Sequence, residues 1–154
     1  MTSSGTHLYD VLRRIRPVHE LSARAVTRGL AERDLSMPLR AVLERVHEDG
    51  PQPVPAIARS LFVTRQGVQA LVDEAKALGY LEARPNPTHR RSHLIGLTPA
   101  GRAAYESVHA AELGRLDELA AGLSREDVAA CVRVLDHLVR GLSPADTDER
   151  TENP

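Results

Sequence analysis

The feature that most constrains this chain is a pair of short helical patterns that meet at a tight corner within residues 54–78. Pro55 suits the first turn of a helix, because the N–H that proline lacks has no partner there anyway. After a break at Leu61-Phe62-Val63, Thr64 is a good N-cap for a second helix. The second helix repeats its apolar residues at spacings of three and four, which predicts one buried stripe made of Val68, Leu71, Val72, Ala75 and Leu78.

The opposite side of this second helix is polar. It carries Gln66, Gln69 and Asp73, with Arg65 beside them at the helix start. Amide and guanidinium groups near a helix N-terminus can reach base edges in the major groove of DNA, so the pattern favours a helix-turn-helix. The competing interpretation is an ordinary helical hairpin with a solvated polar face.

The residues that follow favour the DNA interpretation. Gly79 predicts a left-handed end to the helix, and residues 80–84 and 92–97 predict two short strands. The connecting segment 85–91 contains two prolines and an asparagine, which predict a turn. Thr98 and Pro99 then open another helix as N-cap and first residue. A helix-turn-helix followed by a hairpin with a basic tip is a winged helix, and tip arginines suit the negative potential of a narrow minor groove.

The segment from Leu39 to Arg102 also resembles a known family. The matching motifs are Ile57-Ala58-Arg59-Ser60-Leu61, Gly79-Tyr80-Leu81, Arg90-Arg91 and Leu97-Thr98-Pro99-Ala100-Gly101. They are similar to those of the MarR (multiple antibiotic resistance regulator) family. The resemblance implies a mainly α fold with a small β-hairpin wing (α+β), in which helices on both sides of the winged helix form a dimer. The residues that it implies for DNA contact are Thr64, Arg65, Gln66, Gln69, His89, Arg90 and Arg91.

One position in the wing departs from the family pattern. The family usually has an acidic residue two positions before the wing arginine, which pairs with it. In this chain that position is His89, ahead of Arg91. The ion pair inside the wing is therefore not expected here, although the arginine is present.

Charge is distributed unevenly along the chain. The net charge of −1 conceals seven basic and three acidic side chains in residues 53–102, a balance of +4. Residues 103–154 carry five basic and eleven acidic side chains, a balance of −6. Because phosphate neutralisation supplies much of the affinity for DNA, the basic segment is where contact is expected, and the acidic segment should lie away from the duplex.

The flanking segments predict long amphipathic helices. We expect helices over 6–32, with Pro17 kinking the first, over 37–48, over 98–121 and over 124–142. Their apolar stripes exceed what one small winged helix can cover. We therefore assign 1–35 and 99–142 to a dimerisation region, 36–98 to the DNA-binding domain and 143–154 to a disordered acidic tail. A monomer that folds these helices onto its own domain is the alternative.

Other functions have weaker support in the sequence. No pair among the seven histidines forms a helical zinc motif, since the only two that are four apart, His89 and His93, lie on the predicted wing. No metal or other cofactor is therefore expected, although a metal-responsive regulator remains an alternative. The single Cys131 is interpreted as a small buried hydrophobe rather than a redox switch. No nucleophile motif or phosphate-binding glycine loop points to an enzyme. The absence of a signal peptide and of long apolar runs predicts a cytoplasmic protein without a membrane span.

The resemblance finally implies a ligand-responsive regulator, most simply a repressor on a pseudo-palindromic operator. Arg16 and His19 share one side of the first helix, and Arg40 opens the second helix, which in this family borders the effector cleft. These residues would suit a small anionic aromatic effector, unless they are only solvated surface groups. A winged-helix module that binds protein instead of DNA is the competing class.

Overall fold

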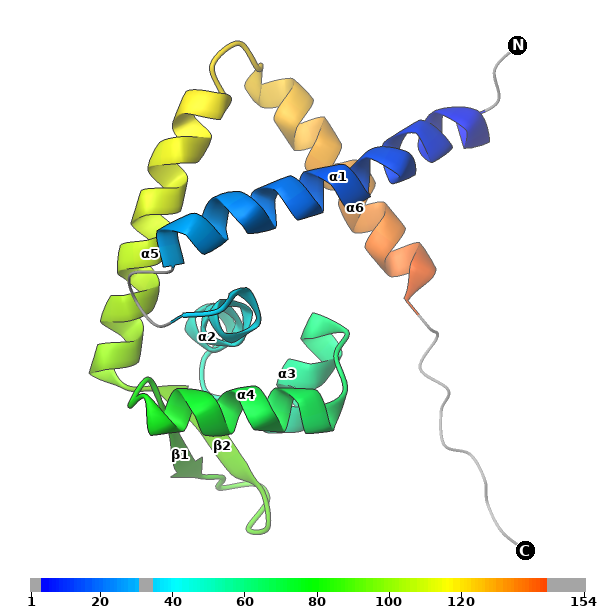
Figure 1. Cartoon of the computed structure of the whole chain (residues 1–154). Helices are drawn as coiled ribbons and strands as arrows, with labels where there is room; N and C mark the ends of the chain where they lie inside the picture. The colour runs from blue at the N-terminus through cyan, green and yellow to red at the C-terminus, as the bar shows by residue number, and fades with distance from the viewer. Residues whose placement is uncertain (1–3, 31–34, 144–154) are drawn as a thin grey trace, which may run out of the picture. The chain divides into compact units, whose positions relative to one another are not determined.

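The computed structural model describes residues 4–30 and 35–143 of the 154-residue chain. It contains six helices and one antiparallel hairpin within these residues, which confirms the expected mainly α fold with a small β wing. In chain order the elements are α1 (Ser4–Leu30), α2 (Met37–Asp49), α3 (Val54–Leu61), α4 (Arg65–Ala77), β1 (Leu81–Pro85), β2 (His93–Leu97), α5 (Pro99–Leu119) and α6 (Arg125–Leu142). Figure 1 shows their arrangement along the chain.

Local capping signals place most helix starts. The hydroxyls of Ser36, Thr64 and Ser124 accept hydrogen bonds from the backbone N–H groups three residues on. Thr98 acts in the same way for α5, since its Oγ1 accepts from the N–H of Gly101 at 3.0 Å. Each of these bonds satisfies one of the N–H groups that have no partner inside the helix.

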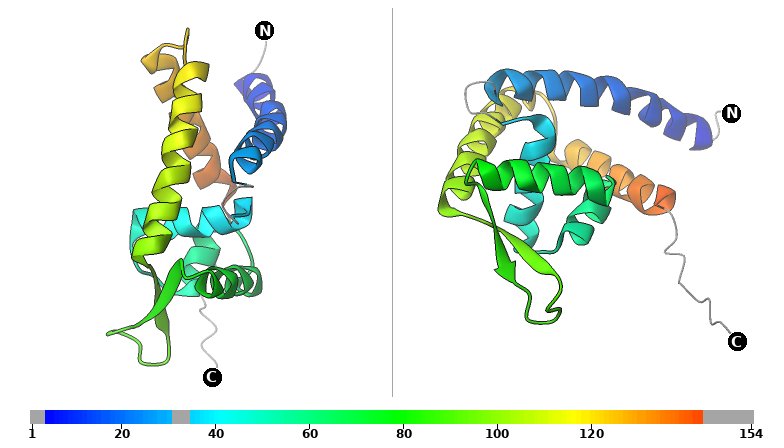
Figure 2. Two further views of the ribbon diagram at one scale, coloured as in Figure 1. Left: turned by 60° about the vertical axis from the view of Figure 1, so that its left-hand side comes forward. Right: turned by 60° about the horizontal axis from the view of Figure 1, so that its bottom comes forward.

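The first compact unit spans Met1–Arg115 and holds the winged helix. Helices α2, α3 and α4 and the hairpin pack around one apolar core, to which the end of α1 and the start of α5 contribute (Figure 2). Its fully buried side chains include Leu39, Leu43, Ile57, Val68 and Val72. The predicted stripe of α4 is buried at Val68, Val72 and Ala75, but the expectation for Leu78 was wrong. Leu78 is 39% exposed because it lies past the end of the helix, at the C-cap.

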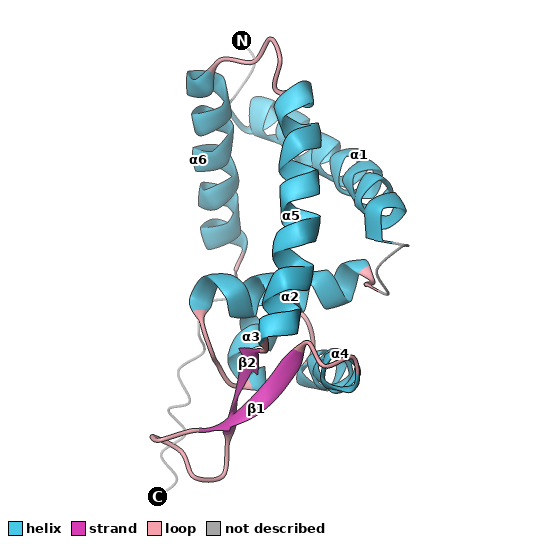
Figure 3. Ribbon diagram, turned by 90° about the vertical axis from the view of Figure 1, so that its left-hand side faces the viewer, coloured by secondary structure: helices cyan, strands magenta, loops and turns pink. Residues whose placement is uncertain are grey.

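The hairpin is anchored at its base to two other segments (Figure 3). Residue pairs run from Leu81↔Leu97 to Pro85↔His93, so the strands begin one residue later than the sequence predicted. Gln52, after α2, exchanges two backbone hydrogen bonds with Ile95, of 3.1 and 2.8 Å. The N–H of Thr98 donates to Tyr80 O at 3.0 Å, which joins α5 to the residue before β1. The base of the wing is therefore fixed to α2 and α5.

Helix α1 runs through Pro17 and ends at Leu30 in the described part of the chain. Only Val26 and Leu30 of its apolar stripe are buried, whereas Leu12, Ile15, Val18 and Leu21 are 38–63% exposed. The remaining predicted residues, 31 and 32, lie outside the described residues. Most of the stripe of α1 thus remains uncovered within this unit.

The second unit spans Leu116–Pro154, and its described part holds the last turn of α5 and α6. Ser124 caps α6 as predicted, since its Oγ donates to the carboxylate of Asp127 and accepts from the Asp127 N–H. The apolar stripe of α6 is exposed except at Leu138. Cys131 is also exposed, so the interpretation as a buried hydrophobe was wrong. The predicted disordered tail lies outside the described residues apart from Ser143.

No helix in the described part of the chain is long and apolar enough to cross a membrane.

Candidate nucleic-acid interface

The second helix of the helix-turn-helix, α4, presents a polar face that its first turn holds in place. Thr64 Oγ1 accepts from the N–H of Gly67 at 3.1 Å, and Phe62 makes the corner before it with a positive φ of 55°. Arg65, Gln66 and Gln69 are all exposed on this helix. The face is solvent-accessible and carries guanidinium and amide donors, the groups that read base edges in a major groove.

Gln69 is partly held in position by its own helix. Its Nε2 donates to Asp73 Oδ1 at 2.9 Å, one turn further along α4. The bond fixes the side chain and leaves the amide oxygen, and one of its two amide hydrogens, for a base. Gln66 and Arg65 make no such bond among the described residues, so they are free to adapt.

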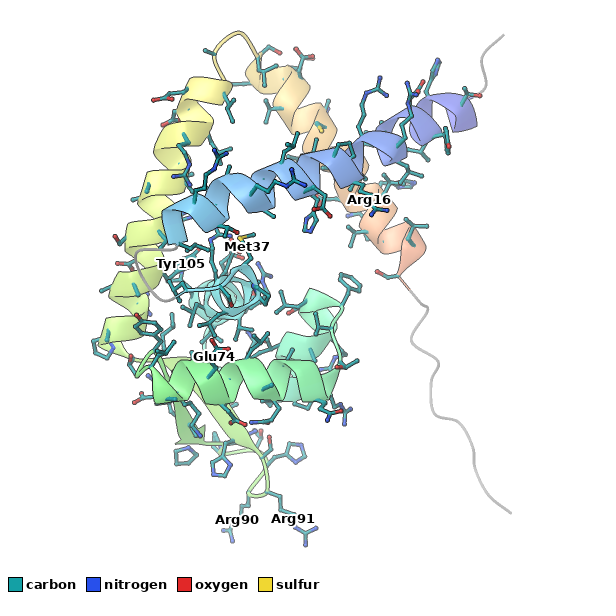
Figure 4. All side chains as sticks on the ribbon, viewed as in Figure 1. Arg16, Met37, Glu74, Arg90, Arg91 and Tyr105 are labelled. Atoms are coloured by element: carbon teal, nitrogen blue, oxygen red, sulfur yellow. The ribbon has the colours of Figure 1, made fainter. Side chains whose placement is uncertain are left out.

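The tip of the wing carries two unpaired arginines. Arg90 and Arg91 are exposed and project away from the body of the winged helix (Figure 4). The tip loop is shaped instead by Asn86, whose Oδ1 accepts from the N–H of Thr88 at 3.1 Å and from its hydroxyl at 2.8 Å. No carboxylate pairs with either arginine in the described residues, and the position of the family's acidic residue is held by His89. The full positive charge of the tip therefore remains available to an anion.

Helix α4, the start of α3 and the wing line an open cavity of about 340 Å³ that the sequence did not indicate. Lys76, Arg91 and His93 contribute basic groups to its lining, together with Gln69. Lys76 lies seven residues after Gln69, two helical turns along the same face, and this spacing was the available signal. The cavity links the polar face of α4 to the wing, so both belong to one basic surface.

The three proposed effector residues differ in exposure and in their partners. Arg16 and His19 are exposed on α1, roughly 15 Å and roughly 10 Å along the helix from the first buried position at Val26. Arg40 is 8% exposed and is ion-paired to Glu112 of α5 through Nη2 and to Glu44 through Nη1, at 3.6 Å. The guanidinium of Arg40 thus already forms ion pairs with two carboxylates.

The same junction of α2 and α5 holds a buried aromatic stack. The ring of Tyr105, itself 2% exposed, lies 4.7 Å from that of His47 and 5.4 Å from that of His109. Burial raises the pKa of the Tyr105 hydroxyl, and the nearby carboxylate of Glu44 adds to the rise. The contact between His47 and Tyr105 joins α2 to α5, whereas the contact between Tyr105 and His109 lies within α5. Among the described residues, no group of three His, Cys, Asp or Glu side chains is placed to hold a metal ion.

Comparison with known proteins identifies the family of this chain. The model of the MarR family matches residues 39–92. An uncharacterized protein of Mycobacterium tuberculosis is 36% identical over 101 residues, which cover 64% of this chain and 71% of that protein. The transcriptional regulator MhqR of Bacillus subtilis is 26% identical over 95 residues, covering 62% and 66%.

Solved structures extend the similarity to most of the chain. The crystal structure of one MarR family transcription regulator has 30% identity and a TM-score of 0.76 over 88% of this chain and 89% of that one. A cysteine-to-serine mutant of MarR from E. coli, complexed with operator DNA, shares the fold at 23% identity, with a TM-score of 0.69 over 93% and 100%. On its sequence and its fold, the chain belongs to the MarR family of DNA-binding transcription regulators.

Proposed function

We propose that this protein represses transcription by binding a pseudo-palindromic operator as a homodimer, and that a small ligand releases it. The observation that carries the proposal is the single basic surface formed by the exposed polar face of α4 and the unpaired arginines of the wing tip. In this proposal Arg65, Gln66 and Gln69 read bases in the major groove, and Thr64 contacts the backbone. Arg90 and Arg91, with His89 beside them, contact the adjacent minor groove or its phosphates.

The exposed apolar faces of α1 and α6 support the homodimer. Leu21 is 63% exposed, and Val132 and Leu142 are 51% and 71% exposed, in helices whose other faces are polar. Exposed apolar helix faces of this kind mark interaction sites. A second copy of the chain offers the same helices under two-fold symmetry and would set two recognition helices about 34 Å apart, one turn of DNA.

The DNA proposal is tested by gel shift with genomic fragments at two or more salt concentrations. Affinity should fall steeply with salt, and Arg91→Ala should reduce the slope of log K against log salt by about one unit. Arg125→Ala, an exposed arginine at the start of α6, is the matched control and should leave the slope unchanged. Binding that does not depend on salt would refute the phosphate contacts and favour a module that binds protein.

Base recognition is tested separately, by selection from randomised sites. Gln69→Ala should relax discrimination at one position of each half-site by about 1–3 kcal/mol. An unchanged base preference would remove Gln69 from the recognition set.

The dimer is tested by sedimentation velocity. Val132→Glu should shift the protein toward a monomer because it buries a charge in the apolar interface. Arg133→Glu changes the neighbouring exposed residue of the same helix and should leave the dimer intact. Equal behaviour of the two variants would mean that this face of α6 is not the interface.

The effector proposal now depends on Arg16 and His19. Arg40 already has two carboxylate partners, so an anion would have to displace Glu112 or Glu44 to reach it. If a small aromatic carboxylate binds near α1, Arg16→Ala should keep operator affinity within about threefold and lose the response to whichever ligand releases the wild-type protein. A variant that responds at the same ligand concentration would exclude Arg16 from the site.

A further inference from the structure

The two faces of the wing hairpin differ in chemistry. Side chains alternate along a strand, so Leu81, Ile95 and Leu97 point together into the core, where all three are buried. The pairing of Glu82 with Gly96 puts Glu82, Arg84 and Gly96 on the opposite, outward face. An outward-facing residue of a two-stranded sheet is normally exposed, yet Gly96 is buried. Something on the outer face must cover it.

The side chain of Arg84 is what covers Gly96. A Cβ added at Gly96 would meet the Cζ and Nε atoms of Arg84 at 2.9 Å and its Cδ at 3.3 Å. The guanidinium then donates to two partners: Nε to Glu82 Oε1 at 2.9 Å and Nη2 to the carbonyl of Leu97 at 3.1 Å. Arg84 thus crosses from β1 over β2 and bonds to both strands, and the absence of a side chain at Gly96 makes room for it.

This arrangement differs from that of the two arginines at the tip. Arg90 and Arg91 have no carboxylate partner among the described residues, whereas Nη2 of Arg84 lies 2.8 Å from Glu82 Oε1. Glu82 offsets the charge of Arg84, and the bond to Leu97 directs the guanidinium toward the base of the wing rather than outward. Leu97 directly precedes Thr98, whose N–H and hydroxyl both bond to Tyr80 O. The contact of Arg84 therefore joins the wing to the point where the wing meets α5.

We propose that Arg84 is a positioning residue for DNA binding: with Glu82 and Gly96 it clamps the two wing strands together and sets the angle at which Arg90 and Arg91 are presented. It is not itself a phosphate contact. The clamp supplies from the outer face of the hairpin the ion pair that the wing tip lacks at His89. The part of this inference that concerns DNA rests on the proposed function, whereas the clamp itself is a property of the free protein.

The salt dependence of operator binding distinguishes a positioning residue from a phosphate contact. Arg84→Ala should weaken operator binding about fivefold, since an exposed ion pair of this kind has a modest effect. It should leave the slope of log K against log salt unchanged, because no phosphate contact is lost. Arg91→Ala should instead reduce that slope by about one unit. A reduction of about one unit in Arg84→Ala would overturn the proposal and make Arg84 a phosphate contact.

Amide hydrogen exchange tests the clamp without DNA. In Arg84→Ala the strand amides of 81–84 and 93–97 should exchange several-fold faster than in the wild type, because the outer face of the hairpin is no longer held. Arg102→Ala is the matched control: it removes an exposed arginine that pairs with Glu106 within α5, and it should not alter exchange in the wing. Unchanged strand exchange in Arg84→Ala would refute the clamp, even if the protein failed to bind DNA at all.

A double-mutant cycle tests the role of Gly96. Gly96→Ala alone should displace the guanidinium and reproduce the loss of affinity and protection seen in Arg84→Ala. In the Arg84→Ala background the same substitution meets no guanidinium and should add little, so the two effects should not be additive. Additive effects would mean that Gly96 and Arg84 act independently, which contradicts the clamp.

Discussion

The contact between the first turn of α5 and the base of the wing makes a strong prediction about two glycines of one helix. Gly101 and Gly114 both lie inside α5. A Cβ at Gly101 would lie 2.0 Å from Tyr80 O and 2.7 Å from its carbonyl carbon, whereas a Cβ at Gly114 would meet nothing within 4 Å. Alanine should therefore destabilise the protein at the first position and stabilise it at the second.

The expected change in the free energy of unfolding follows from two destabilising effects and one stabilising effect. Overpacking against rigid backbone costs up to about 3 kcal/mol. Tyr80 O also accepts the N–H of Thr98 at 3.0 Å, so its displacement weakens a hydrogen bond that contributes about 1 kcal/mol. Alanine in a helix recovers up to about 1 kcal/mol relative to glycine. Gly101→Ala should thus lower the free energy of unfolding by about 3 kcal/mol, and Gly114→Ala should raise it by about 0.5–1 kcal/mol.

Urea denaturation and thermal unfolding, both followed by far-UV circular dichroism, measure the stability of both variants. They are compared with the wild type at equal protein concentration, because the stability of an oligomer depends on concentration. For a chain of 154 residues the midpoint of thermal unfolding should fall by about 10 °C in Gly101→Ala and rise by about 2 °C in Gly114→Ala. Shifts of the same sign in the two variants, or a loss below about 0.5 kcal/mol at Gly101, would refute the reasoning from close contact.

Three further predictions concern stability. Phe62→Gly should raise the free energy of unfolding by about 1 kcal/mol, because Phe62 has a φ of 55° and is 68% exposed; a decrease in urea denaturation would mean that the ring packs more than its exposure implies. Burial raises the pKa of the Tyr105 hydroxyl above its ordinary value of 10.0 in the folded state, so its contribution to the free energy of unfolding should be fully present below about pH 10 and should be lost as the pH rises further. Tyr105→Phe should remove this contribution to the loss of stability between about pH 9 and pH 11, as measured by urea denaturation. Arg40→Ala should lower the free energy of unfolding by about 3 kcal/mol, because it leaves the carboxylate of Glu112, which is only 20% exposed, without its partner. Glu44→Ala should lower it by less than about 1 kcal/mol. Equal losses would contradict the expectation that the pair with Glu112 contributes more than the pair with Glu44.

The sequence by itself determined the elements of this protein and the kind of surface they present. Local signals stand at the start of α4 (Thr64), just past its end (Gly79) and between the strands (Asn86 to Arg91). Each depends on the backbone preferences of a few neighbouring residues, so it can be interpreted without a structure. The polar face of α4 and the basic wing follow from helical periodicity and strand pairing, which are also local.

Contacts between distant residues were decided only by the tertiary structure. Arg40 was interpreted as part of an effector site, but it is buried against Glu112, 72 residues away in the chain. Gly101 and Gly114 are both glycines inside one predicted helix. They differ because the carbonyl oxygen of Tyr80 lies against Gly101, whereas the space beside Gly114 is open. In the sequence, Arg84 is one more basic residue of the wing. Only the structure shows that its side chain lies over Gly96 and donates to the carbonyl of Leu97. Periodicity and capping fix the path of each segment, but the partners of a side chain depend on how the segments pack, and no local pattern encodes that.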